Sequence, residues 1–597
     1  MKKLLVLLMV VVMTFSLVAC GNKQESVDTN TETTTETTTT DSKFKAGTYE
    51  ATAKGFGGDI VATVTLSDDK IDEIKVVGDS ETEGVGSVAV ETLPAIMVEK
   101  QAVAVDAVAG ATVSSKGIMA AVTSALESAG VDVSALVSVE NETNDSVKSE
   151  ETLDVDVVVI GAGGAGMTAA IEAKTAGLNV VIVEKMPMIG GNTIKSTGGM
   201  NAAETDVQAK LGIKDSVETF IKDTMTGGHD VNNIDLVTVL AENSSDAINW
   251  LDSIGAPLPE VSFSGGATNK RIHRPKGGAA VGSYLVEVFS ENLDKLGIDV
   301  MLNTKATEIL SENGSVLGIK AESADINYTI NAKAVILATG GFGANEDMYT
   351  QYRPELKGYV TTNAPGATGD GIAMAEAIGA GFVDMEQIQT HPTVEQTTSI
   401  MITESVRGGG AILVNQAGKR FDNELLTRDV VSADIMEQEG SYAYLIFDQR
   451  LRDDLSAIEE YVNADITVQA ETFEELAGLI DVESTTLVDT LVTWNAAVAS
   501  KKDTEFDRTT GMDDDISAGP FYAIKVAPGV HHTMGGVEIN TKAEVISAEG
   551  TPIAGLFAAG EVTGGVHGGN RIGGNAVADI VVFGRVAAAS AIEYVNK

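Results

Sequence analysis

The sequence has very little cysteine, since Cys20 is the only one among 597 residues. One thiol cannot form an internal disulfide, and it cannot supply a c-type haem motif, an iron–sulfur cluster or a cysteine-rich zinc site. If this chain carries out redox chemistry, it must therefore use organic cofactors. Its 62 glycines, in contrast, suit the turns that bind nucleotides.

Positive charge is also scarce. Lys and Arg together number 41, against 86 Asp and Glu, so the formal net charge is −45. Such an acidic chain is a poor partner for nucleic acid or for an anionic membrane surface, and its charge favours solubility. We therefore expect no nucleic-acid partner.

Long hydrophobic runs are nearly absent too. The apolar run Leu4–Val12 follows two lysines and is too short for a membrane span, so it predicts a secretory signal peptide over residues 1–19. Leu17–Cys20 resembles a bacterial lipobox. That resemblance implies cleavage before Cys20, diacylation of its thiol, and a protein anchored by lipid to the extracellular face of the cell membrane. The alternative is an ordinary signal peptide with a free thiol.

Two polar stretches separate the remaining parts. Residues 20–43 are rich in Thr, Glu, Asp and Ser, and they predict a disordered tether because they have too few apolar side chains for a core. Residues 131–152 predict a linker. Between them, residues 44–130 predict a small α+β domain, with a hairpin of Asp59–Leu66 and Ile71–Val77 and helices near 87–100 and 114–128.

Residues 153–597 predict a large α/β body. The apolar run Val155–Ile160 is typical of a buried parallel strand, and a helix over 167–175 and a strand over 179–183 complete a βαβ unit. Strands near 334–341 and 555–561 are expected in the same sheet. We predict a Rossmann-like domain over 153–385 and 533–597, with a capping domain inserted over 386–532.

A glycine-rich turn follows the first strand of this body. Gly161 allows the tight turn, Gly163 lets the backbone approach a pyrophosphate, and Gly166 lets the helix pack on the strand. Glu184 ends the second strand, where a carboxylate can accept hydrogen bonds from ribose hydroxyls. The strand, the helix and the spacing of the acid together predict a dinucleotide site.

Several longer strings extend this pattern: Lys185–Thr193, Ser196–Asn201, Gly366–Ile372 and Gly573–Val577. They resemble the superfamily that contains the fumarate reductase and succinate dehydrogenase flavoproteins, aspartate oxidase and the soluble flavocytochrome c fumarate reductases. The resemblance implies bound FAD. The residues that it places along FAD, besides the three glycines, are Ala165, Glu184, Asn192, Thr193, Thr197, Gly198, Asp370, His532, Glu561, Ala576 and Val577.

The strings around His391, Met401–Gly408, Asn423–Asp429, His531–Gly536 and His567–Gly574 are most similar to the flavocytochrome c fumarate reductases. Reduction of an activated alkene needs a hydride at one carbon and a proton at the other. An arginine such as Arg571 can grip a carboxylate through two parallel hydrogen bonds and stabilise developing charge. The resemblance implies a substrate site formed by Gly198, His391, Thr403, Glu404, His531, Arg571 and Gly574.

The proton donor of that family corresponds to Arg428. Arginine is an unusually weak acid, and a relay through Glu404 and Arg407 answers this objection because it can return a proton to Arg428. The alternative is that Arg428 and Arg407 only form ion pairs with Glu424 and Asp429.

Two metal hypotheses arise near residue 532. A metal pair of His531 and His532 is disfavoured, because adjacent side chains in an extended segment point apart. The family resemblance implies a sodium ion on backbone carbonyls, and the residues concerned are Thr533, Met534, Gly535, Glu561 and Thr563.

The small domain carries its own signature. Asp106–Thr112 resembles the site at which a flavin transferase esterifies FMN onto threonine, although Ala109 stands where Ser or Thr is common. Gly55–Gly58 also resembles small FMN-binding domains. The resemblance implies covalent FMN on Thr112 and a flavin transferase as maturation partner. The alternative is a helix start near Thr112 followed by Ser114 and Ser115.

Together these features predict a cell-surface fumarate reductase of anaerobic respiration, in which electrons pass from covalent FMN to FAD and then to fumarate. The small-molecule partner is an unsaturated carboxylate, and the electron donor is a membrane or extracellular component. Urocanate, acrylate, methacrylate and cinnamate are alternative substrates. An electron-transfer flavolipoprotein without efficient catalysis is the alternative of another class.

Overall fold

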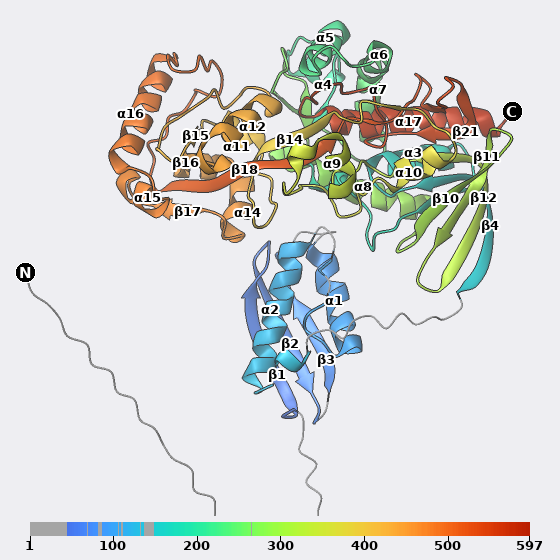
Figure 1. Cartoon of the computed structure of the whole chain (residues 1–597), viewed down its shortest axis with the longest axis horizontal. Coiled ribbons are helices and arrows are strands. Elements are labelled where there is room, and N and C mark those ends of the chain that lie inside the picture. Colours follow the sequence, from blue (N-terminus) through green and yellow to red (C-terminus); the bar gives the residue numbers. More distant parts are fainter. Residues whose placement is uncertain are drawn as a thin grey trace, which may run out of the picture.

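The computed structural model describes residues 44–68, 70–81, 86–105, 107–108, 111–131, 133–136, 148–263 and 265–597. The predicted signal peptide, Cys20 and the tether lie outside these residues, as do Asp106, Ala109 and Gly110. Figure 1 shows three parts: a small domain in blue, a body with a large sheet, and a cap in orange.

The small domain is an antiparallel sheet with the order β1-β2-β3, formed by β1 (Gly47–Lys54), β2 (Asp59–Leu66) and β3 (Ile71–Val77). The predicted hairpin is therefore present, while β1 was not expected from its sequence. The inward residues Ile60, Ala62 and Val64 of β2 are fully buried against α1 (Gly86–Lys100) and α2 (Thr112–Ser128). Alternation of apolar and polar residues thus sets which face of the sheet the helices cover.

The boundaries of the small domain and the body differ from the predicted ones. Val131 and Leu136 belong to the small-domain core, and the Leu136 carbonyl accepts a hydrogen bond from the Val103 amide at 3.1 Å. The small domain therefore extends past residue 130, through the 3₁₀ turn η1 (Val133–Leu136). Strand β4 already begins at Ser149, inside the predicted linker, because its polar first half pairs with β12 (Ile326–Leu337).

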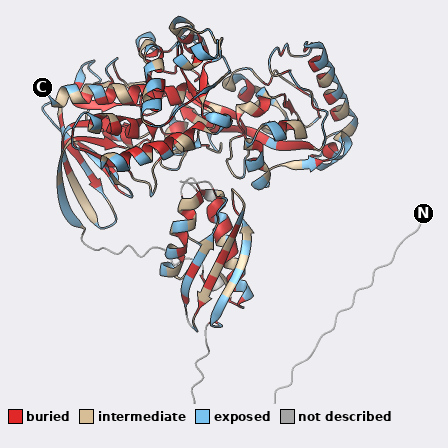
Figure 2. Ribbon diagram, turned by 180° about the vertical axis from the view of Figure 1, so that it is seen from behind, coloured by how far each residue is buried: buried red, intermediate tan, exposed pale blue. Residues whose placement is uncertain are grey.

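The body is built on a sheet with the strand order β10-β11-β21-β12-β4-β5-β9. Its parallel centre comprises β4 (Ser149–Ile160), β5 (Val180–Val183), β12 (Ile326–Leu337) and β21 (Pro552–Ala558). Val157–Ile160 are all buried, as expected for a central parallel strand, and Figure 2 shows that buried residues fill the interior of the body. The predicted βαβ unit is present, with α3 (Gly164–Thr175) between β4 and β5.

The last helix, α17 (Asn575–Val595), packs against α3. Among the described residues it is the one helix long and apolar enough to span a membrane, but 61% of its most apolar window is buried inside the protein. Its apolar surface is therefore used in the core.

The remaining elements of the body surround this sheet. Its other helices are α4 (Asp206–Lys210), α5 (Val217–Gly227), α6 (Ile234–Glu242), α7 (Ser244–Ser253), α8 (Val281–Leu296), α9 (Glu346–Tyr352) and α10 (Asp370–Ala377), with the 3₁₀ turns η2 (Thr193–Lys195), η3 (Lys276–Gly278) and η4 (Pro354–Leu356). Its other strands are β6 (Met200–Asn201), β7 (Glu260–Ser262), β8 (Ile272–Arg274), β9 (Asp299–Met301), β10 (Lys305–Glu312), β11 (Ser315–Glu322), β13 (Phe382–Val383), β19 (Gly536–Val537) and β20 (Glu544–Ile546).

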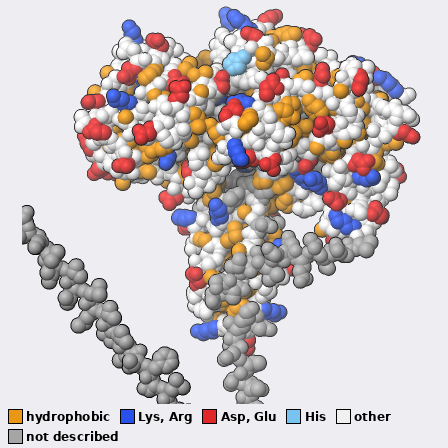
Figure 3. Space-filling model, viewed as in Figure 1, with side chains coloured by type: hydrophobic (Ala, Val, Ile, Leu, Met, Phe, Trp, Pro, Cys, Tyr) orange, Lys and Arg blue, Asp and Glu red, His pale blue; other side chains and the backbone are white. Residues whose placement is uncertain are grey.

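The cap joins the body through two paired strands, β14 (Ile388–Val394) and β18 (Phe521–Thr533), and Figure 1 shows β18 running between the two parts. The cap also contains β15 (Ile412–Val414), β16 (Ala443–Asp448) and β17 (Val468–Ala470), with α11 (Glu404–Gly408), α12 (Arg428–Glu437), α13 (Gln449–Asp454), α14 (Ala457–Asn463), α15 (Phe473–Leu479), α16 (Ser484–Ser500) and η5 (Glu439–Ser441). Acidic side chains are spread over the face seen in Figure 3, between hydrophobic and basic ones.

Candidate active site

A cavity of about 1600 Å³ lies where the three parts meet. The body supplies the carboxyl ends of β4, β5 and β12, and the cap supplies Glu404 and Arg428. The small domain supplies Phe56, Ala111 and Val113. Ligands of open α/β sheets bind at this end of the strands, so the cavity stands where the fold predicts a cofactor.

The glycine turn at the end of β4 shapes one side of the cavity. Gly161 has φ +106°, and a Cβ there would lie 2.4 Å from the carbonyl oxygen of Ala338. A Cβ on Gly166 would lie 2.0 Å from the carbonyl oxygen of Gly161. At Gly163, the N-cap of α3, the nearest protein atom would be 4.0 Å away. The opening beside Gly163 therefore leaves the start of α3 free for a pyrophosphate, which fits FAD.

Glu184 is held in place by the backbone. Its Oε2 accepts a hydrogen bond from the Ala162 amide and its Oε1 one from the Met186 amide, both at 2.8 Å. Burial raises the pKa of Glu184, although these backbone donors oppose the shift. Each carboxylate oxygen keeps a lone pair, so Glu184 can also accept bonds from a ribose.

A polar cluster continues the cavity wall. Asn192 Nδ2 donates to Asn363 Oδ1 at 2.6 Å and to Glu561 Oε2 at 3.0 Å. Thr193 Oγ1 accepts from the Gly164 amide at 3.0 Å. The carboxylate of Asp370 forms an ion pair with Lys185 at 2.5 Å. These contacts fix the side chains before any ligand arrives.

The structure brings the predicted residues together. Those that line the cavity are Gly161, Gly163, Ala165, Glu184, Asn192, Thr193, Thr197, Gly198, Asp370, His391, Thr403, Glu404, Arg407, Arg428, His531, His532, Glu561, Arg571, Gly574, Ala576 and Val577. Gly166 lies behind the wall, at the contact of helix and strand. Their individual roles stay predictions.

The predicted relay forms a chain of charges. Arg428 Nε lies 2.6 Å from Glu404 Oε1, and Arg407 NH2 lies 3.8 Å from the same oxygen. Burial alone would raise the pKa of Glu404, but Arg428 and Arg407 lower it to about 2. Burial lowers the pKa of Arg407 to about 10. Glu404 is therefore a carboxylate held between two guanidinium groups.

The alternative ion pairs are not formed with these arginines in the described part of the chain. The carboxylate of Glu424 is bound by Arg420 at 2.8 Å and by Arg508 at 2.9 Å. Arg407 NH1 donates only to the backbone carbonyl of Glu424, at 2.6 Å. Asp429 pairs with His229 at 3.1 Å. Arg428 is thus paired with Glu404 and stays beside the cavity.

Arg571 and two histidines face the relay. The rings of His391 and His531 lie edge to face with centroids 5.2 Å apart, and Thr362 Oγ1 lies 2.8 Å from His531 Nδ1. Burial, together with the charge of Arg428, holds the pKa of each histidine well below its ordinary value. Burial lowers the pKa of Arg571 to about 9. His391 Nε2 and Arg571 Nε have no hydrogen-bond partner among the described residues, so both can bind a ligand.

Gln389 is a residue that the sequence interpretation missed. Its Oε1 accepts hydrogen bonds from Arg428 NH1 at 2.9 Å and from Arg571 NH2 at 3.1 Å. Its Nε2 is fixed by Asn570 Oδ1 at 2.6 Å. Gln389 stands two residues before His391 in β14, so strand alternation is the signal that places both on one face.

Among the described residues, the side chains do not form a metal-binding group at the position of either metal hypothesis. His531 contacts His391, whereas the next ring, that of His532, lies against His567, so the two neighbours point apart. Among the described residues no group of three or more His, Cys, Asp or Glu is arranged to hold a metal. The predicted sodium site rests on carbonyls of two adjoining segments, which a backbone bridge between Val537 and Thr563 joins, and it stays a prediction.

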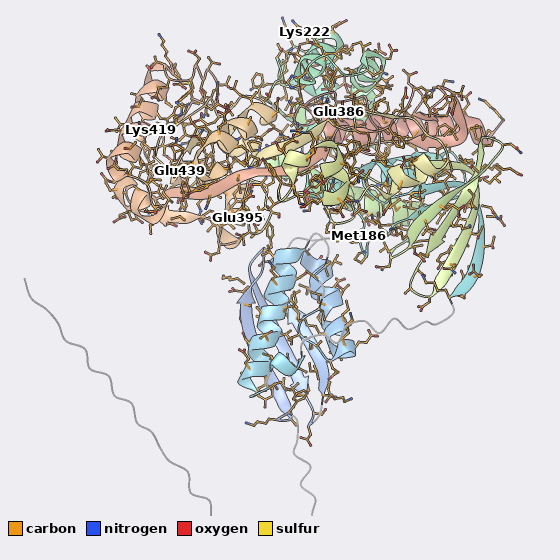
Figure 4. The ribbon with its side chains drawn as sticks, viewed as in Figure 1. Met186, Lys222, Glu386, Glu395, Lys419 and Glu439 are labelled. Atoms are coloured by element: carbon orange, nitrogen blue, oxygen red, sulfur yellow. The ribbon has the colours of Figure 1, made fainter. Side chains whose placement is uncertain are left out.

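The start of α2 borders the same cavity, through Ala111, Val113 and Ser114. Helix α2 begins at Thr112, whose side chain lies outside the described part, and its N-cap Ala111 makes no side-chain cap bond. Met188 of the body packs against the small-domain core, and Figure 4 places nearby Met186 on the side that faces this domain. A group attached at the start of α2 would therefore adjoin the cavity of the body.

Two family models match the chain: an FAD binding domain over residues 156–577 and an FMN-binding domain over residues 55–127. The solved structure of the open conformation of a flavocytochrome c3 fumarate reductase is 43% identical and covers 77% of this chain and 84% of that chain, with a TM-score of 0.67. This chain belongs to the flavocytochrome fumarate reductase family. Its cofactors are FAD and, in the small domain, covalently attached FMN.

Three curated members of this flavoprotein family show its range. "Fumarate reductase (cytochrome)" of Shewanella frigidimarina is 48% identical over 74% of this chain and 78% of its own length. "NADH:fumarate oxidoreductase" of Klebsiella pneumoniae is 45% identical over 92% of this chain, which spans 58% of that longer protein. "Urocanate reductase" of Eggerthella lenta is 38% identical over 92% of both chains. The family is thus one of FAD-dependent oxidoreductases.

Proposed function

We propose that this protein is a fumarate reductase that passes electrons from covalent FMN to FAD and reduces fumarate to succinate. The observation that carries the proposal is that two arginines, Arg428 and Arg571, face one cavity. Arg428 pairs with Glu404, through which it can regain a proton, and both arginines donate hydrogen bonds to Gln389 Oε1. Relatives named as fumarate reductases support the same substrate.

The binding step uses charges that are already oriented. Arg571 and the neutral His531 bind one carboxylate, while neutral His391 and Thr403 bind the other. Thr403 is also the N-cap of α11, and its amide donates to Tyr461 Oη at 3.0 Å, which fixes its position. Because both ends of a dicarboxylate are held, the alkene has a single orientation, and such orientation lowers a barrier by several kcal/mol.

FAD, when bound in this cavity, would supply the hydride. Arg428 then gives a proton from its guanidinium to the adjacent carbon, and Glu404 passes a replacement proton from Arg407. The 2.6 Å contact between Arg428 and Glu404 and the 3.8 Å approach of Arg407 to the same carboxylate oxygen support transfer along this chain of side chains. Positive charge from Arg571 stabilises the carbanionic character that develops before protonation.

The substrate is tested by dye-linked turnover of the purified protein with fumarate, urocanate, acrylate, methacrylate and cinnamate. We expect the highest kcat/KM with fumarate, because only a dicarboxylate uses both binding groups. A higher kcat/KM with a monocarboxylate would show that the substrate is another unsaturated acid. No turnover with any of them would favour an electron-transfer flavoprotein without efficient catalysis.

We also propose that Cys20 anchors the protein to the extracellular face of the cell membrane, where a membrane or extracellular donor reduces FMN. The lipobox-like sequence and the polar stretch after it support this location. Diacylation gives two acyl chains, enough for stable attachment. Cys20→Ala should release the protein from the membrane fraction, and a variant that stays membrane-bound after signal cleavage would rule out the anchor.

A further inference from the structure

Two buried titratable side chains at the cavity wall have no part in the mechanism above. His567 lies in the loop after β21, and Asp579 lies in the second turn of α17. His567 Nε2 is 3.2 Å from Asp579 Oδ2, and the residues are only 3% and 1% exposed. Asp579 also lines the cavity.

The two side chains form a close ion pair. In the described part of the chain His567 is the one partner that the Asp579 carboxylate has at ion-pair distance. A buried carboxylate is costly unless a neighbour supplies charge or a hydrogen bond. Asp579 therefore holds a proton on Nε2 of His567, which fixes the tautomer and orientation of the ring.

This pair connects to a residue predicted to contact FAD. The rings of His567 and His532 lie edge to face with centroids 5.3 Å apart, and His532 Nδ1 is 3.5 Å from Glu561 Oε1. Three neighbouring buried atoms have no partner among the described residues: His532 Nε2, His567 Nδ1 and Asp579 Oδ1. Buried polar atoms are almost always satisfied, so a ligand or water belongs beside them.

We propose that His567 and Asp579 are positioning residues that orient His532 and set the reduction potential of FAD. A carboxylate that supports an imidazole fixes the direction in which the ring can donate, as it does for histidines that bind metals. Because little water screens a buried charge, such a charge also interacts strongly with a neighbouring group that gains electrons. The proposal needs only FAD in this cavity and does not depend on the substrate.

The test is a spectroelectrochemical redox titration of the full-length holoprotein. Asp579→Asn removes the carboxylate, so the FAD midpoint potential should become more positive. His567→Gln leaves the carboxylate without its partner, so the potential should become more negative. The FMN midpoint should not move in either variant, which makes it an internal reference.

The matched control is Asp448→Asn, which changes a buried aspartate of the cap that accepts a hydrogen bond from the Leu451 amide at 3.2 Å. Its FAD midpoint should equal that of the wild type.

Unchanged FAD potentials in both pair variants would overturn the proposal, and so would shifts of the same sign in both. If Asp579→Asn does not retain FAD, His567→Gln decides alone: an unchanged potential overturns the proposal. The substrate proposal is tested separately, by dye-linked turnover of the wild-type protein with fumarate. Failure of the redox proposal is therefore distinguishable from failure of the substrate proposal.

Discussion

Arg428 and Arg571 share one acceptor, Gln389 Oε1, yet they are expected to act at different steps. Arg428 also pairs with Glu404, which leads away from the cavity toward Arg407. Arg571 donates otherwise to the Ile572 carbonyl at 3.1 Å, and among the described residues it forms no ion pair with a carboxylate. This difference separates a proton donor from a residue that binds the substrate carboxylate.

Arg428→Ala should therefore lower kcat by roughly a hundred- to ten-thousand-fold, the range of general acid catalysis, and should leave substrate binding largely intact. Arg571→Ala should weaken binding and turnover together, because that contact exists before and during the reaction. Steady-state kinetics with a reducing dye measures both. Near-normal turnover of Arg428→Ala would show that the proton comes from another group.

The histidines make stability depend on pH. Burial lowers the pKa of His391, His531 and His532, so below about pH 6.5 the unfolded chain binds more protons than the folded chain. Stability from these groups is present above that pH and falls as the pH drops through it. His391→Gln should reduce this loss. Thermal unfolding midpoints of the FAD-loaded proteins across this pH range test it, and an identical pH dependence in both would contradict it.

At the scale of elements, the turn from β4 into α3 combines a packing contact with an opening. Gly166 packs closely against the carbonyl oxygen of Gly161, whereas Gly163 lines the cavity. Both are glycines, but for different reasons: one lets the helix approach the strand, and the other lets a cofactor approach the helix.

Gly166→Ala should consequently destabilise the body by about 1–3 kcal/mol or more, because its Cβ would lie 2.0 Å from the Gly161 oxygen. Gly163→Ala is the matched control, since its Cβ would be 4.0 Å from the nearest protein atom. It should keep the fold and lose FAD affinity. Denaturation curves of the FAD-free proteins and FAD titrations distinguish the two, and equal destabilisation would refute the assignment.

At the scale of the whole molecule, one cavity is bordered by all three parts of the chain. The small domain reaches it with the start of α2, and the cap reaches it with α11 and α12. Electrons delivered to a group on α2 would thus arrive beside the dinucleotide site. The cap residues Glu404, Arg407 and Arg428, which form the relay, border the same cavity.

Thr112→Val should abolish covalent FMN and retain FAD, because valine keeps the shape of threonine but lacks the hydroxyl that forms the ester. Turnover with the natural donor should be lost, while turnover with a dye that reduces FAD directly should largely persist. Flavin fluorescence of the denatured protein gives the readout. Thr92→Val is the matched control, since its hydroxyl bonds the Val88 carbonyl at 2.7 Å within α1. FMN still attached to Thr112→Val would exclude this site.

The sequence by itself determined several strands and the glycine turn. Alternating or continuous apolar runs predicted β2, β3, β4 and β5, because burial of a strand face depends on side-chain type and local periodicity. The spacing of Gly161, Gly163 and Gly166 similarly predicted the dinucleotide turn, because backbone conformation there is a local property. The edge strand β1 was missed because none of its residues is buried, so it lacks the apolar face that marks a strand. The end of the small domain at Leu136 was missed because it is defined by a contact with Val103, which is distant in the sequence.

Only the tertiary structure decided which charges meet. Glu404 pairs with Arg428, which lies 24 positions away in the sequence. Gln389 accepts a hydrogen bond from Arg571, which lies 182 positions away. Sequence patterns gave no choice among Glu404, Glu424 and Asp429 as the partner of Arg428 without the family resemblance. The pairing of β14 with β18, which brings His391 beside His531, also fixed the cavity wall. The physical reason is that electrostatic contacts depend on distance in space, whereas strand and turn patterns depend on neighbours along the chain.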